Sequence, residues 1–340
     1  MFRPFILFVY SLLGIVLLAC STTPSEIKRP TIAEILDRPD IISFPLQTTA
    51  YGRWVVDVNI NGSQTASMIV DTGATYSALF EDILDNFQLT HDLETTVRIH
   101  GLVASGTTPV STVKQLGFGQ DIYLDKSFAV LPKHDGSTEE ILPVDGIIGM
   151  DILKGYRIYV DRAESQIYFI PNEAQQARRP IGMREITLYP NPYSEFGANL
   201  HFFTMGIRIK DTPALLDTGN DVHIMNWHAA NFVEASAMKA RLKSRWKLEG
   251  AIGEFKPVIR ATISMLEANQ YVWENVIVVI KDTDSLNILG VEDQPLIVAG
   301  ISLLDNRNVY IDFENNIMWL EDITGIDTDS ARTVSICVSC

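Results

Sequence analysis

Hydrophobic and polar positions alternate along this chain in many short runs, which is the pattern of half-buried β-strands. Residues 54–60 alternate in this way, Asn61-Gly62 favours a tight hairpin turn, and residues 66–70 form a second apolar run. Further strands are expected at residues 127–131, 157–160 and 167–170. Helical periodicity is scarce and is best at residues 78–87 and 229–246. The pattern predicts a mainly β protein.

The two halves of the chain repeat the same landmarks, and such self-similarity indicates a duplicated structural unit. Each half has an early glycine and then an apolar strand that ends in Asp-Thr-Gly. Asp71 follows Gly52 by 19 positions, and Asp217 follows Gly197 by 20 positions. One such tripeptide alone would equally fit a surface turn, in which Asp and Gly are common.

The match continues downstream of both Asp-Thr-Gly turns. Residues 146–153 and 297–304 each place a glycine within an apolar run, and an aspartate follows Gly149 and Gly300 by 12 positions in each case. Four landmarks in one order favour two lobes over two chance turns. With the polar stretches between them, they divide the chain into a signal (1–20), a tether (21–44), an N-terminal lobe (45–171), an interlobe linker (172–190), a C-terminal lobe (191–322) and a tail (323–340).

Two Asp-Thr-Gly turns can bring two carboxyl groups together. Glycine allows the chain to turn tightly after the strand, and the threonine hydroxyl can brace the turn. Two carboxyl groups about 3 Å apart cannot both ionise readily, so one stays protonated. Asp71 and Asp217 are therefore the candidate catalytic pair for hydrolysing a peptide bond with water as the nucleophile. Neither role is assigned to either residue, because such a pair titrates as a unit.

These residues resemble those of retropepsin-like aspartic proteases. The resemblance rests on Asp-Thr-Gly-Ala at residues 71–74 and on Ile-Ile-Gly-Met-Asp-Ile-Leu at residues 147–153, and it covers about residues 49–171 and again 199–321. It implies a bilobal acid-protease fold built from two retropepsin-like β-barrel repeats, with a single chain sufficient for the active site. It also implies an aspartic endopeptidase that acts on a polypeptide and needs no cofactor.

The resemblance implies roles for further residues. Those expected to support the catalytic loops are Thr72, Gly73, Thr218 and Gly219, and those expected in flaps over the substrate are Gly101 and Gly250. Asn220 departs from the family, which usually has Ser, Thr or Ala at that position. This departure keeps open an alternative function, a catalytically silent, lipid-anchored protein that binds peptide in a protease fold.

The first twenty residues resemble a bacterial lipoprotein signal. Arg3 precedes an apolar run over residues 5–19, which is shorter than the roughly 20 residues of a membrane helix, and the run ends at Leu-Leu-Ala-Cys. This resemblance implies a lipid on Cys20 that anchors the protein to the membrane, facing the periplasm. Ser21 would direct it to the outer membrane of a Gram-negative cell. A cleaved signal with an incidental cysteine and a short uncleaved anchor are the alternatives.

Composition argues against several other classes of protein. The chain of 340 residues has a formal net charge of −15 and no cluster of Lys and Arg, so nucleic acid is a poor partner. The histidines show no His-Glu-x-x-His spacing and phosphate-binding glycine loops are absent, so no metal or cofactor is expected. Gly-x-Ser-x-Gly is also absent, which argues against a serine hydrolase. Cys337 and Cys340 allow a small disulfide loop, with a redox motif as the alternative.

Overall fold

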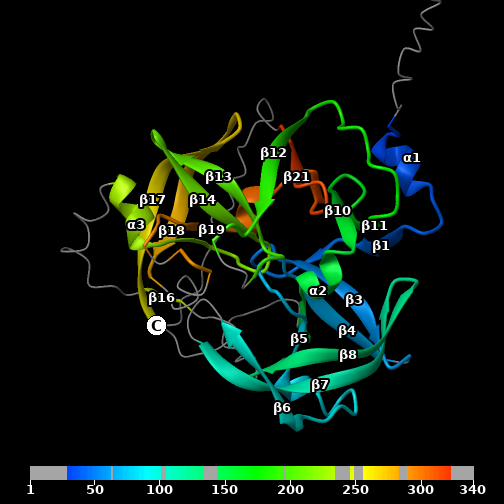
Figure 1. Cartoon of the computed structure of the whole chain (residues 1–340). Coiled ribbons are helices and arrows are strands. Elements are labelled where there is room, and N and C mark those ends of the chain that lie inside the picture. The colour runs from blue at the N-terminus through cyan, green and yellow to red at the C-terminus, as the bar shows by residue number, and fades with distance from the viewer. Residues whose placement is uncertain are drawn as a thin grey trace, which may run out of the picture.

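The computed structural model is mainly β and has two lobes joined by a shared sheet (Figure 1). It describes residues 29–62, 64–100, 105–132, 144–193, 197–233, 246–248, 256–282, 289–291 and 293–322. Each lobe is a small closed barrel, and the buried apolar side chains of both lobes belong to one continuous cluster. The predicted fold class, a bilobal acid-protease fold of two retropepsin-like repeats, is confirmed.

The N-terminal lobe is a barrel in which strands follow the order β2-β3-β4-β9-β5-β8-β7-β6, and a pairing of β3 with β7 closes it. Its strands are β2 (Gln47–Thr48), β3 (Trp54–Ile60), β4 (Gln64–Val70), β5 (Ala78–Phe80), β6 (Asp92–His100), β7 (Ser105–Phe118), β8 (Asp121–Leu131) and β9 (Gly146–Ile148). The predicted strand at residues 54–60 matches β3. Asn61 and Gly62, both with positive φ, turn the chain into β4.

The C-terminal lobe repeats this topology in the order β13-β14-β19-β15-β18-β17-β16, closed by a pairing of β13 with β17. Its strands are β13 (His201–Ile207), β14 (Lys210–Asp217), β15 (His223–Met225), β16 (Trp246–Leu248), β17 (Lys256–Ala268), β18 (Tyr271–Ile280) and β19 (Ile297–Gly300). In both lobes the strand before Asp-Thr-Gly pairs in parallel with the later glycine strand, β4 with β9 and β14 with β19. The duplication seen in the sequence is therefore a duplication of topology.

A third sheet region joins the lobes in the order β1-β11-β10-β20-β21-β12. Its strands are β1 (Ile42–Pro45), β10 (Tyr156–Asp161), β11 (Gln166–Pro171), β12 (Met183–Pro190), β20 (Val309–Asp312) and β21 (Ile317–Glu321). The lobes meet where β10 pairs with β20, with Tyr159 opposite Tyr310. The strand β12 lies within the span predicted as a linker. Its residues 183–187 pair with β21, and the chain then enters the C-terminal barrel.

Helical structure is short wherever the structure describes the chain. The helices are α1 (Ile32–Leu36), α2 (Met150–Leu153) and α3 (Trp227–Ala230), with 3-10 turns η1 (Glu81–Ile83), η2 (Asn231–Val233) and η3 (Ile301–Leu304). Both α1 and most of β1 fall in the span predicted as a tether, where Ile32, Ile35 and Ile42 are buried. Among the described residues, no helix is long and apolar enough to cross a membrane.

The helix predicted over residues 78–87 is wrong. Residues 78–80 form β5, which pairs with β8 and β9 in the barrel, and only Glu81–Ile83 turns into a 3-10 helix. All three residues of β5 are buried, and burial on both faces removes the polar positions that distinguish a strand from a helix. The helix predicted over residues 229–246 is present only as α3 and η2; residues 234–245 lie outside the described part of the chain.

Candidate active site

Asp71 and Asp217 lie at matching ends of two buried strands. The strand β4 ends at Val70, immediately before Asp71, and β14 ends at Asp217 itself. Both strands are held between neighbours, because β3 and β9 flank β4 while β13 and β19 flank β14. The barrels thus fix the position of each aspartate through the ladder hydrogen bonds of its own lobe.

The two threonines tie these ends together across the lobe boundary. The backbone N–H of Thr72 donates to Oγ1 of Thr218 over 3.1 Å, and the N–H of Thr218 donates to Oγ1 of Thr72 over 3.1 Å. Each hydroxyl also donates to a carbonyl of the other lobe, Thr72 to Leu216 over 2.8 Å and Thr218 to Val70 over 2.7 Å. Both threonines are buried. These four bonds form a nearly symmetric brace across the lobe boundary.

The brace brings the two carboxyl groups into direct contact, and they are hydrogen-bonded to each other. Oδ1 of Asp71 accepts N–H bonds from Gly73 over 2.8 Å and from Ala74 over 3.0 Å. Oδ1 of Asp217 accepts from Gly219 over 3.1 Å. The carboxyl of Asp71 therefore receives shorter backbone bonds, which stabilise its ionised form more strongly.

The surroundings raise the pKa of both carboxyl groups. For Asp217, burial raises the pKa well above the ordinary carboxyl range, the neighbouring Asp71 raises it further, and the N–H groups of Gly219 and Asn220 oppose the rise. For Asp71, burial also raises the pKa, but its donors, the bond from Asp217 and the charge of Arg53 oppose it. Because burial raises the pKa of both groups, the pair keeps a proton, and the shorter backbone hydrogen bonds to Asp71 favour the position of that proton on Asp217.

Glycine is required in both turns by the closeness of the opposite carboxyl. A Cβ added to Gly73 would lie within 3.0 Å of the carboxyl atoms of Asp217, and one added to Gly219 would lie equally close to those of Asp71. Real Cβ contacts are not that short. The sequence-based reason for these glycines was a tight turn; the structure adds that each leaves room for the partner aspartate.

Each Asp-Thr-Gly loop is held by a second polar side chain six residues after its aspartate, and here the lobes differ. In the N-terminal lobe, Ser77 accepts the N–H of Gly149 over 3.0 Å and donates its hydroxyl to Asp151 over 2.7 Å. In the C-terminal lobe, Nδ1 of His223 accepts the N–H of Gly300 over 3.0 Å. That bond leaves the ring proton on Nε2, which lies 2.8 Å from Oγ of Ser302.

Sequence reasoning did not assign these second residues to the site. Their signal is their position, since Ser77 and His223 each follow their aspartate by six positions, and Asp151 and Ser302 each follow Gly149 or Gly300 by two positions. The residue types differ between the lobes, because the pair Ser77–Asp151 contains a carboxylate and the pair His223–Ser302 does not. Burial lowers the pKa of His223 to about 4, so the ring is neutral near pH 7.

Asn220, the departure from the family, occupies the position of Ala74 in the second loop. Its side chain is buried, and Nδ2 has no hydrogen-bond partner among the described residues. The backbone carbonyl oxygen of Asn220 accepts the N–H of Ile301 over 2.8 Å, which fixes the backbone of the loop. The C-terminal half thus places an unpaired amide donor beside the catalytic loop, where the N-terminal half has a methyl group.

The other predicted site residues fall outside the described part of the chain: Cys20, Gly101 and Gly250, together with Cys337 and Cys340. The structure does describe the strands that flank the two expected flaps, β6 and β7 in one lobe and β16 and β17 in the other. Within the described residues, no group of three or more His, Cys, Asp or Glu side chains could hold a metal ion.

The paired Asp-Thr-Gly loops on duplicated barrels define the class of the structure, a two-lobed retropepsin-like β fold. Residues 56–155 match the family model of the gag-polyprotein putative aspartyl protease. This span runs from β3 to the end of α2 and includes Asp71, Gly149 and Asp151. The N-terminal lobe therefore resembles this protease family in sequence as well as in fold. No curated protein matches the chain.

Proposed function

We propose that the protein is an aspartic endopeptidase whose single active site is built from Asp71 and Asp217 of one chain. The observation that carries the proposal is the hydrogen-bonded carboxyl pair, held across the lobe boundary by the two threonines. Buried carboxyl groups are rare unless paired, and two in contact form the acid and base that hydrolysis of an amide requires.

In the proposed reaction, the carboxylate of Asp71 removes a proton from water, whose oxygen attacks the carbonyl carbon of the peptide. The proton of Asp217 moves to the carbonyl oxygen, which gives a neutral tetrahedral diol. Asp71 then passes its proton to the peptide nitrogen, the C–N bond breaks, and one diol hydroxyl returns a proton to Asp217. The pair ends in its starting state, with Asp217 protonated and Asp71 ionised, so the next cycle can begin without a change in the number of protons on the pair.

The test uses the soluble chain that begins after Cys20, incubated with a diverse peptide library from acid to neutral pH. Asp71→Asn and Asp217→Asn are run beside it, with Asp211→Asn as a control for an exposed aspartate on β14. We expect cleavage by the parent and by Asp211→Asn, and a loss of at least about 10²–10⁴-fold in both site variants. Cleavage that survives either site substitution would refute the mechanism.

The second candidate is a silent peptide-binding protein, and Asn220 is the observation that favours it. Its buried and unpaired Nδ2 stands where the first loop has only Ala74, so the two halves of the site are not equivalent. If the parent cuts no peptide at any pH but binds a peptide-like inhibitor of aspartic proteases, this candidate replaces the first. Recovery of cleavage in Asn220→Ser would identify Asn220 as the cause.

We also propose that Cys20 carries lipid and holds the protease domain at the bacterial cell envelope, facing the periplasm, with the outer membrane as its site in a Gram-negative cell. The support is the Leu-Leu-Ala-Cys end of the apolar run. Labelling with radioactive palmitate tests this proposal. Label and membrane association should persist in Cys337→Ser and disappear in Cys20→Ser; label in Cys20→Ser would contradict it.

A further inference from the structure

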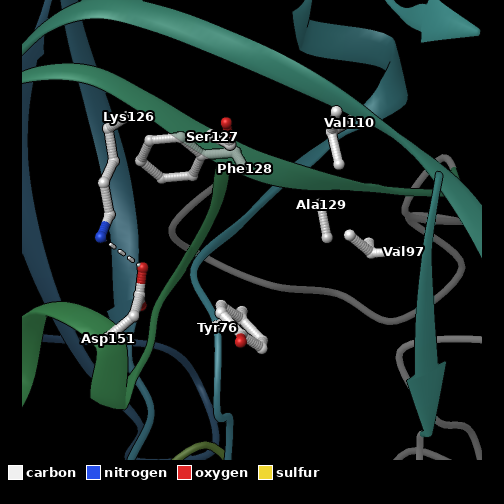
Figure 2. Close-up of a pocket in the computed structure, with 8 residues that line it drawn as sticks. All are labelled: Tyr76, Val97, Val110, Lys126, Ser127, Phe128, Ala129 and Asp151. Atoms are coloured by element: carbon white, nitrogen blue, oxygen red, sulfur yellow. Dashed lines mark ion pairs between the residues drawn. The ribbon is translucent and has the colours of Figure 1, made fainter. Parts of the chain in front are cut away.

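A cavity of about 230 Å³ lies in the N-terminal lobe beside the catalytic loop (Figure 2). It is bounded by β6, β7 and β8, by the loop after Asp71 and by α2, and its lining residues are Tyr76, Val97, Val110, Lys126, Ser127, Phe128, Ala129 and Asp151. Tyr76 is five positions after Asp71 and largely exposed. One wall of the cavity is therefore formed by the loop that follows Asp71.

The size and walls of the cavity fit one apolar side chain. The volume of about 230 Å³ is below the roughly 300–1,000 Å³ of sites for whole small molecules. Val97, Val110 and Ala129 lie together on one side, away from the polar residues (Figure 2). An apolar side chain placed there would leave water for a largely apolar wall, which stabilises its binding.

The opposite side of the cavity carries two charges that cancel. Nζ of Lys126 lies 2.8 Å from Oδ2 of Asp151, with exposed side-chain fractions of 23% and 11%. Figure 2 shows Lys126 reaching from β8 to Asp151 on α2. Oδ1 of Asp151 also accepts the N–H and the hydroxyl of Ser77, so its position is fixed. The matching position of the C-terminal lobe holds Ser302 with neutral His223, so this arrangement distinguishes the two halves.

On the basis of the proposed protease function, we infer that this cavity is a specificity pocket for an uncharged, apolar side chain of the substrate, and that the Lys126–Asp151 pair makes it reject charged ones. A basic side chain would meet Lys126, and an acidic one would have to compete with Asp151 for it. Either would also lose water against the apolar wall. Lys126 and Asp151 are specificity-determining residues that do not touch the reacting atoms.

Substituting one member of the ion pair should change which side chains the pocket accepts, in favour of basic ones without Lys126 and of acidic ones without Asp151. Lys126→Met leaves the carboxylate of Asp151 unpaired at the pocket, so peptides with Lys or Arg at the selected position should gain about tenfold or more in kcat/KM relative to Leu. Asp151→Asn keeps an acceptor for Ser77 but frees Lys126, so peptides with Glu should gain by a similar factor. The measurement is kcat/KM for peptides that differ only at that position.

The control is Lys114→Met, which breaks the ion pair with Asp125 on the same barrel; neither of these residues lines the cavity. Its side-chain preference should equal that of the parent. A second variant, Val97→Phe, narrows the cavity from a partly exposed position without touching the ion pair, and should shift the preference from Leu to Ala. Unchanged selection in Lys126→Met and Asp151→Asn, or in Val97→Phe if those two do not fold, would overturn the inference.

A failure of the proposed protease function can be distinguished from a failure of the pocket inference. If the parent cuts no peptide, the same set is tested for binding by fluorescence anisotropy. Tighter binding of the Leu peptide than of the Lys and Glu peptides, with the reversals described above, would support the pocket while the protease function fails. Equal binding of all three peptides by the parent and the variants would overturn the pocket as well.

Discussion

At the scale of single residues, Thr72 and Thr218 connect the chemistry to the fold. Each hydroxyl accepts an N–H from the opposite threonine and donates to a carbonyl of the opposite lobe. A hydroxyl is suited to this place because it can donate and accept at the same time. Loss of either hydroxyl would leave buried groups unpaired and would also loosen the contact between the aspartates.

We therefore expect Thr72→Ala to lower the free energy of unfolding by about 1–3 kcal/mol, because the carbonyl of Leu216 and the N–H of Thr218 lose their partner. Thr72→Ser keeps the hydroxyl and should lose much less. Urea denaturation measures both values. Equal stability of the alanine and serine variants would show that the hydroxyl does not stabilise the lobe boundary.

His223 predicts acid sensitivity of the C-terminal lobe. Burial lowers its pKa from an ordinary 6.5 to about 4, so the unfolded chain binds a proton at a pH where the folded chain does not. The stability linked to this group is complete above pH 6.5 and falls as the pH drops towards 4, by about 3 kcal/mol in total. Protonation would also remove the acceptor for the N–H of Gly300.

The measurement is urea denaturation of the parent and of His223→Gln at pH 7 and pH 4. Glutamine offers an acceptor and a donor without titrating, so the variant should lose less stability than the parent over this range. His201, the other described histidine that is buried, is unchanged in both proteins and so cancels in the comparison. An equal loss in parent and variant would contradict the role of His223.

The aspartates, threonines and glycines of the site could be predicted from the sequence, because the tripeptides are contiguous and occur twice. The pairs Ser77–Asp151 and His223–Ser302 could not, since their members are 74 and 79 positions apart and are joined only by the fold. The cavity beside Tyr76 was equally hidden. Its residues come from separate strands whose register the alternating pattern does not specify.

At the scale of elements, the two Asp-Thr-Gly loops depend on the two strand pairs that carry them. Asp217 lies opposite Gly300 in the parallel ladder of β14 and β19, as Val70 lies opposite Ile148 in that of β4 and β9. The sequence indicates these strands clearly, because each is an apolar run next to a glycine. The helix predicted at β5 was wrong, because its three buried residues show no alternation of polar and apolar positions that would separate a strand from a helix.

Substitution of the loop glycines tests how closely the two loops approach each other. Gly73→Ala and Gly219→Ala each place a Cβ within 3.0 Å of the opposite carboxyl, so the loops must separate, and we expect cleavage to fall by about 10²-fold or more. Gly206→Ala is the matched control, because its Cβ would lie 3.6 Å from the nearest atom, a normal contact. Full activity in Gly73→Ala would show that the two carboxyl groups need not lie this close together for cleavage.

At the scale of the whole molecule, the sheet between the lobes fixes how the two barrels face each other. Nε of Arg157 on β10 lies 2.9 Å from Oδ2 of Asp312 on β20, and both side chains are buried. The guanidinium of Arg157 also donates to the carbonyls of Ala174 and Asn172 in the segment after β11. This ion pair joins residues of the two lobes, and the sequence showed only one half of it, an aspartate 12 positions after Gly300.

Breaking this pair should be costly, because Asp312 would be buried without an opposite charge, and Arg157 would keep only the more distant and largely exposed Glu314. We expect Arg157→Met and Asp312→Asn each to lower the free energy of unfolding by about 3–5 kcal/mol, and the double variant to lose less than the sum. Urea denaturation of the four proteins gives the coupling energy. Additive losses would show that the two side chains do not stabilise the lobe contact together.

The central claim is that Asp71 and Asp217 share one proton within a single chain. The measurement that tests it most directly is the pH dependence of kcat/KM for one peptide, with the parent and the two Asp→Asn variants. The account predicts a bell-shaped profile for the parent, which needs one carboxyl protonated and the other ionised, and a loss of at least about 10²–10⁴-fold in either variant. A profile with only one limb, or a variant that retains activity, would contradict it.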